Sequence, residues 1–157
     1  MNTQVWIAVA VGIAAMADDL ARRHIANWIP AAALAGGLGW QIGRDGWHGL
    51  LTALGGAVLG FCVFLIFYLK GGMGGGDIKL MAGFGALLGA SLILQAAIWG
   101  AAIGGVMAVS ALMWRSLQKK WRPALEAMTA EQQERAATIP YAPAITLGVW
   151  LVLAAKA

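Results

Sequence analysis

LLTALGGAVLGFCVFLIFYL, residues 50–69, is a run of 20 amino acids without a single charge. An α-helix needs about 20 mostly apolar residues to cross the hydrocarbon core of a bilayer, so this stretch is long enough for one membrane span. The whole chain has the same character, since 61% of its 157 residues are hydrophobic and 11% are charged. A soluble fold of this size could not bury so much apolar surface. The composition therefore predicts a membrane protein.

Apolar runs on both sides of residues 50–69 predict five further spans. Most of them are shorter than a full span, so we expect them to extend into flanking polar residues. The chain is then an all-α, polytopic membrane protein with about six transmembrane helices, forming a single integral-membrane domain over residues 1–157. Between the fourth and fifth spans, the short segment 89–91 is predicted to be a turn, and one long broken helix is the alternative. A polar loop is expected at about 115–138. The five further runs are Val5–Ala17, Trp28–Ile42, Ile78–Leu88, Leu92–Trp114 and Ile139–Ala155.

Basic residues are divided unevenly between the two sides of this arrangement. Of the eleven Lys and Arg residues, only Arg44 and Lys156 fall on one side, which leaves nine on the other. Cytoplasmic loops of membrane proteins carry such an excess of basic residues. The loops after the first, third and fifth spans are therefore predicted to be cytoplasmic, with both termini on the opposite side. This topology accounts for the net charge of +4 without nucleic-acid binding.

The few acidic residues differ in where they lie. Four fall in predicted loops, where a solvated charge is ordinary, and three lie at the edges of predicted spans, where an ionised carboxylate is expensive and a functional role becomes the default. The loop residues are Asp45, Glu126, Glu131 and Glu134, and the span-edge residues are Asp18, Asp19 and Asp77.

Each span-edge carboxylate also has a structural explanation. Asp18 and Asp19 lie near the C-terminal end of the first predicted helix, where the helix dipole disfavours them and Arg22 and Arg23 could pair with them. Asp77 follows a glycine-rich run and precedes an apolar one, so it could act only as an N-cap.

The topology nevertheless places Asp19 and Asp77 on different helices at the same membrane face. Two neighbouring carboxylates share a proton, so that one can act as a base on water while the other donates a proton to a carbonyl. His24 and His48 fall on opposite sides of the membrane, which argues against a Ser-His-Asp site or a His-based metal site. We expect no metal and no cofactor.

Three motifs resemble those of the type IV prepilin peptidases, membrane aspartyl proteases of the G-x-G-D class, and especially the short form associated with tight-adherence pili. Residues 74–80 are similar to the family's G-x-G-D-x-K-L. Asp19, Ile25 and Asn27 match an aspartate followed six residues later by I-P-N, with Ala26 where the family usually has proline. Residues 139–143 resemble its I-P-Y-A-P segment.

The resemblance implies that Asp19 and Asp77 are catalytic. It also implies that Gly74, Gly76, Lys79, Ile25 and Asn27 form the motifs around them. The implied reaction is cleavage of the leader peptide of type IV, Flp-like prepilins at the cytoplasmic face of the bacterial inner membrane. The implied partners are the prepilin and membrane lipid. Larger relatives carry a four-cysteine zinc domain linked with N-methylation, whereas this sequence has one cysteine, Cys62.

Two other functions compete with this interpretation. A small transporter or proton and cation pathway could use the same two aspartates. A non-catalytic pilus assembly factor could keep the fold without the reaction. A transporter would be expected to bury its charges deep within the spans, whereas these aspartates lie at one membrane edge.

Overall fold

The computed structural model describes residues 3–69, 73–119 and 141–156, and every regular element in these ranges is an α-helix. Within them, α1, α2 and residues 90–114 of α4 are long and apolar enough to cross a membrane, while α6 is a shorter apolar helix. The predicted all-α membrane class is confirmed. The helices are α1 (Thr3–Arg22), α2 (Trp28–Leu69), α3 (Gly75–Leu88), α4 (Ala90–Lys119) and α6 (Ala142–Lys156).

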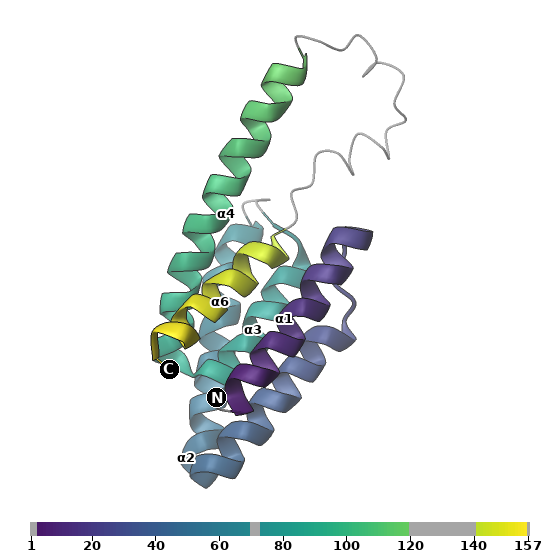
Figure 1. The fold of residues 1–157 in the computed structure, drawn as a ribbon. Coiled ribbons are helices and arrows are strands. Elements are labelled where there is room, and N and C mark those ends of the chain that lie inside the picture. Colours follow the sequence, from purple (N-terminus) through teal and green to yellow (C-terminus); the bar gives the residue numbers. More distant parts are fainter. Residues whose placement is uncertain (1–2, 70–72, 120–140, 157) are drawn as a thin grey trace.

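Helix α2 contains the second and third predicted spans as two legs of a tight hairpin (Figure 1). The sequence suggested a loop between residues 42 and 50, but the helical conformation is interrupted only at Gly46, where φ is 55° and ψ is −126°. Glycine adopts this left-handed region at little cost, which allows the chain to reverse within one residue. A Cβ on Gly49 would overlap the backbone of Gln41, so a small residue is needed where the two legs meet.

Helix α3 is the central helix of the bundle. Its 14 residues are about 21 Å long, less than the ~30 Å of a bilayer hydrocarbon core, and most of them are buried. It ends at Gly89, whose φ of 78° separates it from α4. The two predicted spans are therefore separate helices rather than one broken helix. Helix α4 continues to Lys119, so the first residues of the predicted 115–138 loop are helical, and residues 120–138 lie outside the described ranges.

Glycine allows α3 and the second leg of α2 to pack backbone against backbone. A Cβ on Gly56 would overlap the carbonyl oxygen of Gly85, and one on Gly85 would overlap that of Gly56. One turn further along α2, a Cβ on Gly60 would lie 2.6 Å from the carbonyl oxygen of Met81. Small residues commonly provide such close approach between membrane helices, where lipid offers no hydrophobic drive for association.

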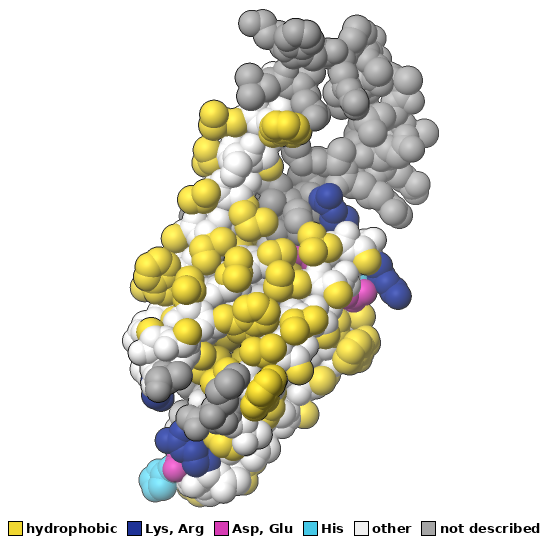
Figure 2. Space-filling view, in the orientation of Figure 1, with side chains coloured by type: hydrophobic (Ala, Val, Ile, Leu, Met, Phe, Trp, Pro, Cys, Tyr) yellow, Lys and Arg dark blue, Asp and Glu magenta, His cyan; other side chains and the backbone are white. Residues whose placement is uncertain are grey.

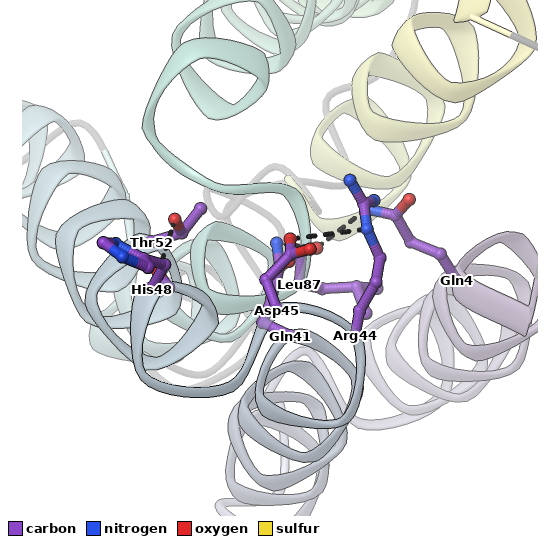
Figure 3. Close-up of polar contacts among 7 residues, drawn as sticks. All are labelled: Gln4, Gln41, Arg44, Asp45, His48, Thr52 and Leu87. Carbon is purple, nitrogen blue, oxygen red and sulfur yellow. Dashed lines mark hydrogen bonds and ion pairs between the residues drawn. The ribbon is translucent and has the colours of Figure 1, made fainter.

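The far end of α3 is held by two buried amide side chains (Figure 3). Gln4 of α1 and Gln41 of α2 both donate hydrogen bonds to the carbonyl oxygen of Leu87, at 2.8 and 3.2 Å. The last carbonyl groups of a helix have no partner within the helix, and leaving one buried without a partner would be costly. The two glutamines therefore tie the end of α3 to two neighbouring helices.

The two termini lie at one end of the bundle, and the ends of α1 and α2 and the start of α3 lie at the other (Figure 1). Figure 2 shows mostly apolar side chains between these two ends, with the charged side chains gathered toward them. Arg22 and Lys79 belong to the second end, which we call the aspartate end because Asp19 and Asp77 lie there; Arg44 lies at the terminal end. This distribution is that of a protein with an apolar belt and two polar faces.

The contact between Gly56 and Gly85 gives a test of how α3 is held. Gly56→Ala should lower the free energy of unfolding by roughly 1 to 3 kcal/mol, because the added methyl group meets backbone atoms that cannot rotate away. The neighbouring Gly55 has no atom within 4 Å of a built Cβ, so Gly55→Ala is the matched control and should be neutral or slightly stabilising. Thermal unfolding in detergent micelles measures both, and equal stability of the two variants would contradict the packing described.

Candidate active site

Asp19 is a buried carboxylate where the last turn of α1 meets the start of α6. The residue is 6% exposed, and its Oδ2 accepts a hydrogen bond of 3.1 Å from the backbone N–H of Ala142, the first residue of α6. The first N–H groups of a helix lack partners within the helix and favour negative charge. The N-terminus of α6 thus offsets the unfavourable position of Asp19 near the C-terminus of its own helix.

Asp77 is also buried, with 7% of its surface exposed, and it lies in the first turn of α3. Considered as an N-cap from the sequence, it is instead the third residue of a helix that begins at Gly75. Its Oδ2 accepts a 3.1 Å hydrogen bond from the backbone N–H of Gly74, and its own N–H donates to the carbonyl oxygen of Gly74 at 3.2 Å. Gly74 has no side chain with which to complete a capping box. The side chain of Asp77 therefore caps α3 from inside its first turn through Oδ2, and Oδ1 takes no part in this hydrogen bond.

The two carboxylates come from helices distant in sequence, yet both lie at the aspartate end and are near enough to interact electrostatically. A backbone N–H donates a hydrogen bond to one oxygen of each carboxylate, and Arg23 in addition interacts electrostatically with Asp19. The structure thus brings together the two residues that the sequence singled out. Two neighbouring carboxylates are the groups that acid–base chemistry on a water molecule requires.

Asp18 has a structural role that the sequence predicted only in part: its pairing with Arg22 is confirmed, whereas its bond from Ala26 was not foreseen. Its Oδ2 accepts a 2.7 Å hydrogen bond from the backbone N–H of Ala26, and its Oδ1 pairs with Nε of Arg22 at 3.2 Å. Together these bonds close the turn that follows α1, where Arg23 adopts a left-handed φ of 55°. A proline at position 26 would have no N–H to donate, so the departure of Ala26 from the I-P-N pattern coincides with a bond that only a non-proline residue can make.

The two aspartate motifs contact each other through their other residues. Asn27 Oδ1 accepts a 2.8 Å hydrogen bond from Nζ of Lys79, although the two positions are 52 residues apart. Ile25 is 3% exposed and packs against Gly76, where a Cβ would lie 3.1 Å from the Cβ of Ile25. The turn after α1 is thereby docked on the first turn of α3.

All seven residues that the sequence placed in the site lie at this end of the bundle. The hydrogen bond from Ala142 was not foreseen, although it falls within the 139–143 motif; residues 139 and 140 of that motif lie outside the described ranges. His24 follows α1 at the aspartate end, whereas His48 lies beside Gly46 at the other. In the part of the chain that the structure describes, no three His, Cys, Asp or Glu residues are grouped so as to hold a metal ion.

Comparison with known proteins agrees with the motifs. The sequence pattern of the type IV leader peptidase family matches residues 6–109, which include both aspartates and the contact between Asn27 and Lys79. The chain belongs to this family. The resemblance drawn from the motifs is confirmed.

Among curated relatives, the prepilin leader peptidase/N-methyltransferase of Bacillus subtilis (strain 168) is 32% identical over 105 residues. These residues are 66% of this chain and 35% of the relative, so the chain spans well under half of the length of the protein it matches. No solved structure matches the fold.

The hydrogen bonds of Asp18 predict an effect on stability. Asp18→Ala should lower the free energy of unfolding by roughly 1 to 3 kcal/mol, because it removes a charged acceptor from a partly buried N–H. Asp45→Ala is the control, since Asp45 makes only an exposed pair with Arg44 at 3.4 Å, and pairs of that kind contribute about 0 to 1 kcal/mol. Thermal unfolding of the two variants side by side measures the difference, and an Asp18→Ala variant as stable as Asp45→Ala would remove Asp18 from this role.

Proposed function

We propose that this chain is a membrane aspartyl endopeptidase that removes the leader peptide of type IV, Flp-like prepilins, with Asp19 and Asp77 as its catalytic carboxylates. The observation that carries the proposal is that these two buried carboxylates, from helices far apart in sequence, lie at the same end of the helical bundle. Family membership and the name of the Bacillus subtilis relative support the substrate class.

The proposed reaction uses the pair directly on water. The ionised carboxylate takes a proton from water as the water oxygen forms a bond to the scissile carbonyl carbon, and the protonated carboxylate donates its proton to the carbonyl oxygen. The tetrahedral intermediate then breaks its carbon–nitrogen bond. The carboxyl group that took the proton from water donates it to the leaving nitrogen, and the other carboxylate takes back a proton from a hydroxyl group of the intermediate. The products are a new carboxyl terminus and a new amino terminus, and the carboxylates are regenerated without a covalent intermediate.

The segment before α3 is suited to contact a peptide backbone. Gly74 and Gly75 are exposed beside the buried Asp77, and glycine lets another chain approach closely because it has no Cβ. Lys79 and Asn27, joined by their hydrogen bond, fix the turn that carries Ile25 against Gly76. In this proposal Lys79 and Asn27 are positioning residues that keep the end of α1, with Asp19, fixed against the start of α3, with Asp77.

The proposed location is the bacterial inner membrane, with the aspartate end in the cytoplasm and both termini in the periplasm. The excess of basic residues around the loops at the aspartate end supports this orientation. In this orientation the leader is cut at the cytoplasmic face, and lipid surrounds the apolar belt seen in Figure 2.

Substitution of each carboxylate tests the catalytic proposal. Asp19→Asn and Asp77→Asn should each reduce cleavage of a Flp-like prepilin in proteoliposomes by about a thousandfold or more, because neither amide can act as a base or exchange the shared proton. Asp18→Asn is the matched control and should retain most of the activity, since its amide oxygen can still accept from Ala26.

Loss of activity in Asp18→Asn with full activity in Asp19→Asn would move the site by one residue. If the wild-type protein cleaves no prepilin but carries protons or cations in an Asp19-dependent manner, the peptidase proposal fails in favour of a transporter.

Labelling of single cysteines tests the orientation. In a Cys62→Ala background, a membrane-impermeant maleimide added to spheroplasts should label Arg44→Cys and should reach Arg22→Cys only after the membrane is opened. These two positions lie at opposite ends of the bundle, so each serves as the control for the other. The reverse pattern of labelling would place the aspartate end in the periplasm.

A further inference from the structure

An apolar pocket of about 180 Å³ lies between α2, α4 and α6 and is not used by the proposed reaction. Phe64 and Phe67 from α2 form one wall, with their ring centroids 6.0 Å apart. Backbone and small side chains of α4 form another, and the start of α6 contributes Tyr141 and Ile145. The full lining is Phe64, Phe67, Met73, Gly100, Ala101, Gly105, Tyr141 and Ile145.

Two residues of the pocket lining are sequence neighbours of the residues that donate hydrogen bonds to the carboxylates. Met73 immediately precedes Gly74, whose N–H binds Asp77, and Tyr141 immediately precedes Ala142, whose N–H binds Asp19. An occupant of the pocket would therefore lie one residue away from each of the two hydrogen bonds that hold the aspartates. The pocket lining is thus continuous along the chain with the residues that hold both aspartates.

The size of the pocket indicates what it can hold. An apolar cavity of about 150 Å³ is known to bind benzene, whereas pockets for drug-sized ligands measure roughly 300 to 1,000 Å³. A volume of about 180 Å³ thus fits a single aromatic or large aliphatic side chain and is too small for a whole helix.

Helix α4 leaves this space open by having small residues where it faces the pocket. Gly105 has no atom within 4 Å of a built Cβ, and Ala101, one turn earlier, lines the same pocket. Both positions are exposed, as is Phe67 across from them, so the pocket is open between α2 and α4. A peptide held in the membrane could enter from this side.

We propose that this pocket binds one large apolar side chain of the peptide substrate, at a residue flanking the scissile bond, and so determines where the chain is cut. The inference rests on the proposed peptidase function. It assigns specificity to Phe67, Ala101 and Gly105, which lie outside the family motifs, and to Tyr141 of the 139–143 motif.

Filling the pocket tests the assignment. The substrates are membrane-embedded precursors with a basic leader and an apolar helix, which differ only in carrying Phe or Ala beside the scissile bond. Wild-type protein should cleave the Phe precursor with a kcat/KM at least about tenfold above that of the Ala precursor, because burial of the ring favours it. Gly105→Leu should bring this ratio close to one.

Gly55→Leu is the matched control, since Gly55 is also an exposed helix position with no atom within 4 Å of a built Cβ and does not line the pocket. It should keep the wild-type ratio. Ala101→Leu is a second filling variant in case Gly105→Leu fails to fold. If the ratio of kcat/KM for the Phe and Ala precursors is unchanged in the filled variants, the assignment is overturned. It is also overturned if kcat/KM falls equally for both precursors, which is the result expected if a lipid chain occupies the pocket.

A cross-linking measurement separates failure of the pocket from failure of the reaction. A precursor carrying benzoylphenylalanine beside the scissile bond should cross-link to Met73, Phe67 or Tyr141, even in the Asp19→Asn variant that does not cut. Cross-links to other surfaces would reject the pocket, whatever the activity. If cleavage does not depend on Asp19 and Asp77, the catalytic proposal fails while the cross-links still report on binding.

Discussion

The backbone contact between α3 and the second leg of α2 is the constraint on which the rest of the arrangement depends. Gly56 and Gly85 let the two helices approach until the addition of a single methyl group would overlap a carbonyl oxygen. The short α3 is thereby enclosed within the bundle, tied at its far end by Gln4 and Gln41. Its first turn then lies among the neighbouring helices rather than in a free loop, and this places Asp77 near Asp19.

Helix termini make two buried carboxylates tolerable at this position. The N-terminus of α6 faces Asp19 and that of α3 surrounds Asp77, so each carboxylate accepts a backbone N–H and experiences the positive end of a helix dipole. Arg23 also interacts electrostatically with Asp19, so positive charge near this carboxylate comes from a side chain as well as from a helix end. The arrangement therefore stabilises two buried carboxylates at one end of the bundle.

The apolar runs were sufficient to predict the helical segments, because the thickness of the bilayer sets their length. The distribution of basic residues was sufficient to predict which loops lie at the same end of the bundle. A reversal between residues 42 and 50 was predicted, but its tightness and its position at Gly46 were not, since a composition rich in glycine does not show which one adopts a positive φ. Motifs identified Asp19 and Asp77, but not that Ala142 binds the first or that Lys79 binds Asn27. These contacts join segments 123 and 52 residues apart, and no local pattern encodes such distances. The apolar pocket likewise arises only when three helices meet.

The central claim is that Asp19 and Asp77 act on water as one unit, and the rates of single and double variants test it most directly. Residual cleavage by Asp19→Asn, Asp77→Asn and the double variant can be followed by mass spectrometry over long incubations with excess protein. If the carboxylates form one catalytic pair, either single change already disables the unit. The rate of the double variant should then lie within a few fold of the rate of the slower single variant. A double variant whose loss equals the product of the two single losses would show that the aspartates act independently and would contradict the account.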